Sequence, residues 1–282
     1  MKIAVVGGNG FIGKEFTKYA LKKGHQLTVI GSSVDIFSDA GAEQAGERIA
    51  QNEAVVFLAA KRPTVEFSLE EYYYNIRLAG TYFDIARRND IRNIVTASSV
   101  AAYSSTNLPW KEEECQCPLS LYGASKQAVD GLVLHYNNQY DMKIKSLRLA
   151  QVIGMGERKG FLLNTLIDNA ISGKKQMIYG TGAGRRQYIY VKDVCDALLH
   201  SITKQPESEG IFNIGLCDNV SIIELAQIIN EVFGNEAGIE TFPDKPEDTK
   251  QYLMDVTKME QELHWIPRYD LQRAFTEIKE NC

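Results

Sequence analysis

Three glycines that follow a short apolar run constrain this chain more than any other feature. They are Gly7, Gly10 and Gly13. The apolar run at residues 3–6 reads as a buried strand, and residues 11–23 after it have the pattern of a helix. Residues without a Cβ let the backbone approach a pyrophosphate, and a helix N-terminus offers unpaired N–H groups. A strand before the glycines and a helix after them favour a dinucleotide-binding turn over an ordinary tight turn.

Further apolar runs alternate with helical patterns through the first half of the chain. The runs cover residues 26–30, 54–60, 93–98 and 144–150, and the helical stretches lie near 40–51, 68–88 and 120–140. Strands that are apolar throughout and separated by helices are typical of a parallel sheet covered on both faces. The sequence therefore predicts an α/β fold, a Rossmann-type doubly wound parallel sheet.

After residue 150 the alternation becomes less regular. Glycine-rich turns at 154–156 and 180–182 lie on either side of a predicted helix. A second helix is expected to begin near Val191, a strand to cover 211–214, and Ser221 to cap a further helix. We therefore predict a dinucleotide-binding domain over residues 1–153. A smaller, mainly substrate-binding C-terminal lobe would cover 154–282, with a segment at about 186–203 returning to the first domain.

Composition narrows the class of function. Basic and acidic residues are interspersed and the net charge is −5, which disfavours nucleic acid and membrane surfaces as partners. No apolar run reaches the roughly 18 residues of a membrane span, and the first strand begins too early for a signal peptide. Five scattered cysteines and four histidines without metal spacing indicate reduced thiols and no metal site. We expect a cytoplasmic protein.

A Tyr-x-x-x-Lys pair occurs often by chance and is informative only in context. The chain has three such pairs, Tyr19/Lys23, Tyr122/Lys126 and Tyr188/Lys192. The first lies on the helix after the glycine turn, where a solvent-side stack is the simpler interpretation, and Tyr188 lies in a segment that looks extended. Only Tyr122 and Lys126 begin a helix that follows a strand ending in Ser98 and Ser99, on the cofactor side of the sheet.

The spacing of Tyr122 and Lys126 suits acid–base chemistry. Positions i and i+4 share one face of a helix, and a nearby ammonium stabilises a tyrosinate because opposite charge favours the ionised form of an acid. Ser99 could form a hydrogen bond with the substrate oxygen that Tyr122 deprotonates. The alternative is a buried tyrosine hydroxyl beside an exposed lysine.

With these residues the chain resembles the extended short-chain dehydrogenases/reductases, specifically the NAD(P)-dependent nucleotide-sugar epimerases and dehydratases. The resemblance rests on the glycine turn, the strand end at Ser99 and the Tyr-Gly-Ala-Ser-Lys motif at 122–126. It extends over nearly the whole chain. The other matching segments are 58–60, Asn75, 147–149, Gly154, 179–182, Arg186, 190–194, 212–215 and 265–267.

The resemblance implies hydride transfer at a sugar carbon. Tyr122 would take the hydroxyl proton, Lys126 would hold the nicotinamide ribose, and Ser99 would orient the oxygen. In an epimerase the keto sugar then turns over and receives the hydride on its other face. The implied cofactor is NAD or NADP. The residues implied to contact it are Gly7, Asn9, Gly10, Phe11, Ile12, Gly13, Ser32, Leu58, Ala59, Ala60, Asn75, Tyr122 and Lys126.

On the substrate side, the resemblance implies that Arg186 binds the diphosphate of the substrate. Gln151 stands where the family usually has an Asn that contacts phosphate. Val100 and Ala101 replace the acidic pair of the dehydratases, which disfavours dehydration. The second strand ends near Ser32 without the acidic residue that holds the ribose of NAD, which slightly favours NADP.

The C-terminal loop at 243–250 lacks the family's arginine, and Lys245 and Lys250 are candidate replacements. We expect a nucleotide-sugar epimerase of surface polysaccharide or deoxysugar synthesis. The alternatives are an NADPH-dependent keto-sugar reductase and a non-catalytic NAD(P)-sensing protein. The family also implies a homodimer, formed through the helices near 68–88 and 120–140. The sugar and its nucleotide stay open.

Overall fold

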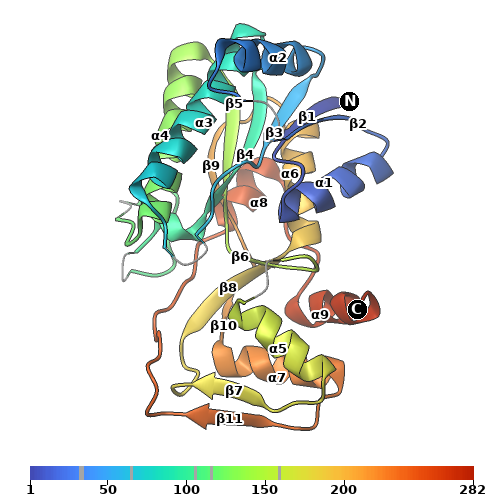
Figure 1. Cartoon of the computed structure of the whole chain (residues 1–282), viewed down its shortest axis with the longest axis vertical. Coiled ribbons are helices and arrows are strands. Elements are labelled where there is room, and N and C mark those ends of the chain that lie inside the picture. Colours follow the sequence, from blue (N-terminus) through green and yellow to red (C-terminus); the bar gives the residue numbers. More distant parts are fainter. Residues whose placement is uncertain (32–34, 64–65, 105–106, 115–116, 158–159) are drawn as a thin grey trace.

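The computed structural model describes residues 1–31, 35–63, 66–104, 107–114, 117–157 and 160–282. These residues form an elongated molecule with a larger part, which holds the N-terminus, above a smaller one (Figure 1). No helix in these ranges is both long and apolar enough to cross a membrane.

The larger part is built on a six-stranded sheet whose paired strands are all parallel in the described residues. In spatial order the strands are β2 (Gln26–Ile30), β1 (Lys2–Val6), β3 (Ala54–Phe57), β4 (Asn93–Ser99), β5 (Lys143–Leu149) and β9 (Gly210–Ile214). The predicted parallel sheet is confirmed. Because helices bury both faces, a central strand such as β3 is apolar throughout, whereas β5 also carries the buried Lys145 and Arg148.

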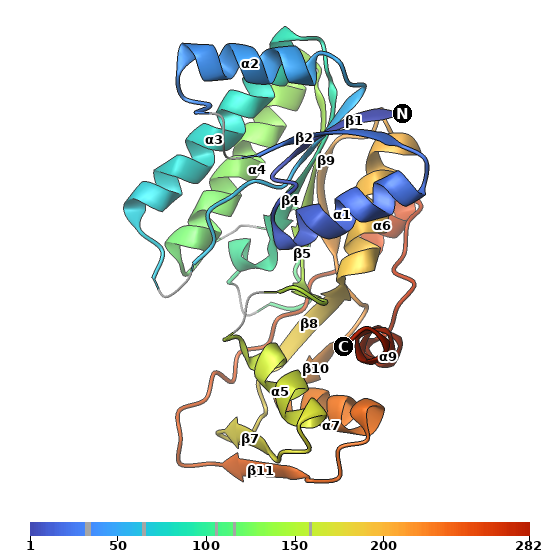
Figure 2. The same ribbon diagram turned by 45° about the vertical axis from the view of Figure 1, so that its right-hand side comes forward.

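Helices cover the two faces of this sheet (Figures 1 and 2). The helices are α1 (Phe11–Lys22) and α6 (Val191–Thr203) on one side, and α2 (Asp39–Ile49), α3 (Leu69–Arg88) and α4 (Leu121–Tyr140) on the other. Alternate residues of β1 enter different cores: Ile3 and Val5 join one cluster, and Ala4 and Val6 join the other. This is the period of two that places successive strand residues on opposite faces.

The smaller part is built mainly from segments after β5. Its strands form a three-stranded sheet, β10 (Asn219–Ser221), β8 (Arg185–Tyr190) and β6 (Gln151–Ile153), and a parallel pair, β11 (Ile239–Phe242) and β7 (Gln176–Tyr179). The helices of the second half besides α6 are α5 (Leu162–Ile171), α7 (Ile222–Phe233), α8 (Thr257–Leu263) and α9 (Leu271–Glu280). The predicted cap of α7 is present: Ser221 Oγ accepts from Glu224 N, and Ser221 N donates to the Glu224 carboxylate.

The chain returns to the larger part after β8. Helix α6 packs against α1, and β9 pairs with β5. We keep the division near residue 153 as a proposal, and in it the returning segment comprises α6 and β9. The residues at the carboxyl ends of β3, β4 and β5 lie on the side of the sheet that meets the smaller part (Figure 1).

Candidate active site

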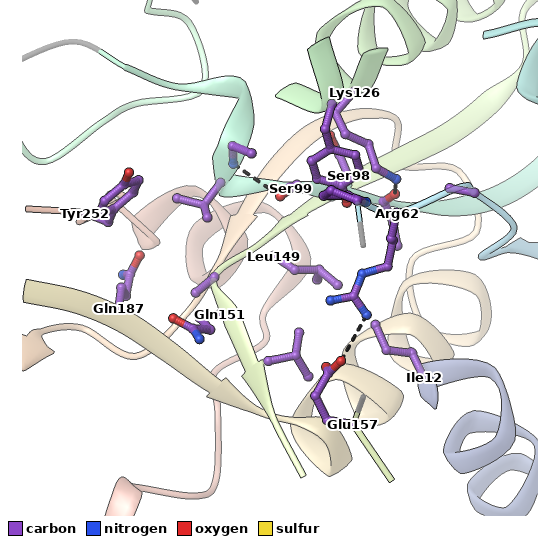
Figure 3. A pocket seen from close by; sticks show the side chains of 18 of the residues that line it. Ile12, Arg62, Ser98, Ser99, Lys126, Leu149, Gln151, Glu157, Gln187 and Tyr252 are labelled. Carbon is purple, nitrogen blue, oxygen red and sulfur yellow. Dashed lines mark hydrogen bonds and ion pairs between the residues drawn. The ribbon is translucent and has the colours of Figure 1, made fainter. Parts of the chain in front are cut away.

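A cavity of about 430 Å³ lies between the carboxyl ends of the central strands and the smaller lobe (Figure 3). It brings together residues that are far apart in the sequence. The predicted site residues in its lining are Ile12, Leu58, Ala60, Ser99, Tyr122, Lys126, Gln151 and Arg186. The proposed acid–base pair and the proposed phosphate-binding residues therefore share one cavity.

Tyr122 and Lys126 lie on one face of the first turns of α4. Ser120 caps this helix by accepting a hydrogen bond of 3.0 Å from Gly123 N. The Lys126 ammonium lies 5.8 Å from the centroid of the Tyr122 ring and donates to Ala97 O at 2.8 Å. Lys126 is only 8% exposed, so the alternative of an exposed lysine is wrong. The tyrosine ring is fixed by an edge-to-face contact with Phe67.

Neither of the other Tyr-x-x-x-Lys pairs reaches the cavity. Lys23 lies over the ring of Tyr19, as expected, and the Tyr19 hydroxyl donates to Asp196 on α6. Burial and this hydrogen bond raise the pKa of Tyr19, which makes it a poor base. Tyr188 is buried in β8, where desolvation raises its pKa.

Two serines at the end of β4, Ser98 and Ser99, line the cavity and differ in the hydrogen bonds of their hydroxyl groups. Ser99 Oγ accepts a hydrogen bond from Ala101 N at 3.2 Å, at the start of the short helix η1 (Val100–Ala102). Ser98 is 5% exposed, and its Oγ has no hydrogen-bond partner within the described part of the chain. Buried hydroxyls normally have a partner, so Ser98 indicates a place for a polar ligand atom. Sequence reasoning missed Ser98, although it adjoins Ser99.

The glycine turn fits a dinucleotide. A Cβ on Gly7, which has a φ of +85°, would lie 2.7 Å from Ala59 N, and one on Gly13 would lie 2.3 Å from Gly7 O. A Cβ on Gly10 would meet only Gly7 O, at 3.5 Å, so that side of the turn is open. Among the described residues no side chain caps α1, and the first turn of this helix carries no acidic residue. An open backbone surface at an uncapped helix N-terminus suits a pyrophosphate.

Two other predicted cofactor residues, Asn9 and Phe11, adjoin the glycines of this turn in the sequence. Asn9 lies beside Gly31, at the end of β2, since a Cβ on Gly31 would meet Asn9 Nδ2 at 2.9 Å. Phe11 packs near Gly154, at the junction with the smaller lobe. Ser32 lies outside the described residues.

Asn75 does not line the cavity; its side chain instead forms hydrogen bonds with the backbone of Lys61. Its Oδ1 accepts from Lys61 N at 2.7 Å, and its Nδ2 donates to Lys61 O at 3.0 Å. Asn75 also contacts Ser125 Oγ at 3.4 Å and is buried. It therefore holds the loop after β3 against α4, next to Lys126.

Replacing Gly10 by Val should remove dinucleotide binding without disturbing the fold. The side chain would project to the open side of the turn, so the affinity for NAD should fall by more than about tenfold, or about 1.4 kcal/mol. The stability of the nucleotide-free protein should fall by only about 1 kcal/mol, because Gly10 is the N-cap of α1 and Val is a poorer N-cap than Gly. Fluorescence titration with NAD and thermal unfolding measure both effects. Gly131→Ala is the control, because a Cβ there meets nothing within 4 Å; equal NAD binding by both variants would contradict this placement.

On the substrate side, Gln151 and Arg186 lie on neighbouring strands, β6 and β8. Sequence reasoning missed several cavity residues that carry no motif. They include Arg62, Glu157, Gln187 and Tyr252. Arg62 Nη1 pairs with Glu157 Oε1 at 3.2 Å and so joins the loop after β3 to the smaller lobe.

A buried polar network lies behind this cavity. Arg148, which is fully buried, donates from Nε to Asp130 Oδ2 at 2.8 Å and from Nη1 to the Tyr103 hydroxyl and to Glu112 O. Asp130 lies one turn after Lys126 on the same face of α4. Burial raises the pKa of Tyr103 to about 12, so the phenol stays neutral. The network thus ties the helix of Tyr122 to β5 and to the loop after Ser99.

The chain is similar to known proteins over most of its length. The model of the NAD dependent epimerase/dehydratase family matches residues 3–215. A UDP-glucose 4-epimerase of Corynebacterium glutamicum is 27% identical, over 98% of this chain and 94% of that protein. A probable UDP-arabinose 4-epimerase of Arabidopsis thaliana is 26% identical, over 95% and 77%. The crystal structure of UDP-N-acetylglucosamine 4-epimerase from Bacillus cereus has a TM-score of 0.90 and 30% identity, covering 100% of this chain and 96% of that one.

Proposed function

The chain belongs to the NAD dependent epimerase/dehydratase family, and from this premise we propose that it is a nucleotide-sugar 4-epimerase. It is an enzyme of the extended short-chain dehydrogenase/reductase type, and of the two cofactors left open the family's description names NAD. One observation carries the proposal. A single cavity is lined by Ser99, Tyr122 and Lys126 on one side and by Arg186 on the other.

The chemistry follows from the residues of this cavity. When bound, NAD supplies a reversible two-electron oxidation of the sugar carbon. Tyr122 accepts the proton of the sugar hydroxyl and returns it after the sugar has turned over. The adjacent ammonium of Lys126 stabilises the tyrosinate, and Ser99 donates a hydrogen bond to the reacting oxygen. The glycine turn, Leu58 and Lys126 are proposed to hold the cofactor.

Epimerisation is favoured over dehydration by what stands next to Ser99. Val100 and Ala101 line the cavity there. Elimination of water needs a side chain that moves a proton between sugar carbons and oxygens, and neither an isopropyl nor a methyl group can do this. The relatives named above also support epimerisation, since each is described as a 4-epimerase that acts on a UDP-sugar.

The cofactor requirement separates an epimerase from a reductase. We expect the purified protein to bind NAD and to interconvert a UDP-sugar pair without consuming cofactor. UDP-glucose, UDP-N-acetylglucosamine and UDP-arabinose form the test panel, with products separated by chromatography. Stoichiometric consumption of NADPH would support the keto-sugar reductase instead. Binding of NAD without turnover of any sugar would support the sensing protein.

Replacing Ser99 by Ala should lower kcat by about tenfold to a hundredfold. A hydrogen bond to a group that carries charge contributes about 1.5–3 kcal/mol, and each 1.4 kcal/mol corresponds to a tenfold change in rate. The affinity for NAD should change little, because this hydroxyl is proposed to contact the sugar oxygen. Steady-state kinetics and NAD titration measure the two effects. A fall in NAD affinity with unchanged kcat would place Ser99 on the cofactor.

A further inference from the structure

A segment of residues 247–252, which we term the strap, lies against β8 in the smaller lobe. It follows β11 and runs up toward the larger part (Figure 1). Its backbone bonds to β8 at two points, with Arg185 N donating to Lys250 O at 3.1 Å and Tyr252 N donating to Arg185 O at 3.1 Å. Tyr252, at the end of the strap, lines the cavity.

The strap is fastened at its first residue. The Glu247 carboxylate accepts hydrogen bonds from Thr181 N at 2.8 Å, Thr181 Oγ1 at 2.9 Å, Ala183 N at 2.6 Å and Gly184 N at 3.3 Å. Gly180 and Gly182 in this turn have φ values of +74° and +75°. Turns of this kind direct several N–H groups to one concave side and bind anions. The hydrogen bonds from Thr181 lower the pKa of Glu247, so it is an anion at neutral pH.

The next strap residues hold the arginine proposed to bind the diphosphate. Arg186 Nη2 donates to Asp248 Oδ2 at 2.7 Å, and Nη1 donates to Lys250 O at 2.6 Å. The guanidinium carbon lies 4.4 Å from the centroid of the Tyr252 ring, a stacking distance. The direction of Arg186 at the cavity wall therefore depends on where the strap lies.

We propose that Glu247 is a positioning residue for the diphosphate of the substrate. It does not line the cavity. It acts by fixing the strap, and the strap fixes Arg186 and Tyr252. This inference rests on the proposed function, because it assigns Arg186 to a nucleotide diphosphate.

The test measures binding of UDP to the NAD-loaded protein by calorimetry, together with steady-state kinetics. Glu247→Gln keeps the size of the side chain but loses the anion. The Kd for UDP and the KM for the UDP-sugar should both rise about tenfold, and kcat should stay within about threefold. That split is expected when binding common to ground and transition states is lost. NAD affinity should not change.

A second variant displaces the strap by a substitution in the turn that binds Glu247, at Gly184. A Cβ on Gly184 would lie 2.1 Å from Asp248 O, so Gly184→Ala should push the strap away and give the same rise in Kd. The control is Glu240→Gln, which removes an exposed carboxylate of the same lobe that pairs with Lys175 at 3.1 Å. This variant should bind UDP as the wild type does.

The outcomes separate this inference from the proposed function. Wild-type affinity in Glu247→Gln would overturn the inference alone, whatever the result for Gly184→Ala. A fall in kcat with unchanged Kd and KM would also overturn it, because the residue would then act in the chemical step. If the wild type bound none of UDP, dTDP and GDP, the proposed function would fail, and the inference would fail with it.

Discussion

Replacing Tyr122 by Phe should lower kcat by about 10²–10⁴-fold, the range expected when a general acid–base group is lost. The change removes one hydroxyl and keeps the ring, so the contact with Phe67 should persist. The fold, NAD binding and substrate binding should therefore survive. Steady-state kinetics of the variant, with unfolding and NAD titration alongside, separate lost chemistry from lost structure.

The matched control is Tyr19→Phe, which makes the same deletion in another Tyr-x-x-x-Lys pair. Its hydroxyl contacts Asp196, and Tyr19 does not line the cavity. We expect kcat close to that of the wild type. Equal rates for both variants would mean that Tyr122 does not move the proton.

The second large effect is on stability. Replacing Asp130 by Asn removes the carboxylate that pairs with the fully buried guanidinium of Arg148 at 2.8 Å. Removing one partner of a buried ion pair costs about 3–5 kcal/mol, because the remaining charge stays desolvated. We expect a loss of about 3 kcal/mol in the free energy of unfolding, measured with urea.

Asp84→Asn is the control for this prediction. Asp84 also lies on a helix and pairs with Arg87 at 2.7 Å and Arg88 at 2.6 Å, but it is partly exposed. Surface pairs contribute about 0–1 kcal/mol, so this variant should be nearly as stable as the wild type. If the two substitutions had equal effects, the other partners of Arg148 would be sufficient to compensate its charge.

The parts of the fold that the sequence predicted are those with local signals. Strand β2 has the expected bounds, and α3 and α4 begin within one residue of expectation. Their apolar periodicity and their serine caps lie in the segment itself. Strands β6, β7, β10 and β11 were not foreseen. They are only three or four residues long, and each pairs with a strand that is distant in the sequence.

In the candidate site, too, only the residues with a local sequence signal could be predicted. Tyr122 and Lys126 could be found because their relation is one turn of a helix. The Glu247 anion site and the Arg62–Glu157 pair join loops that only tertiary packing brings together. The acidic run at 112–114 has the composition of a solvated loop, yet Glu112 is 8% exposed and accepts a hydrogen bond from Asn213 N at 2.7 Å.

The most direct test is turnover in D₂O, with the product examined by NMR. If the sugar carbon is oxidised and reduced again by hydride transfer within one cavity, the inverted carbon should keep its own hydrogen and carry no deuterium. Tyr122→Phe should form almost no product under the same conditions. Deuterium at the inverted carbon would show inversion through a carbanion instead, and would contradict the account.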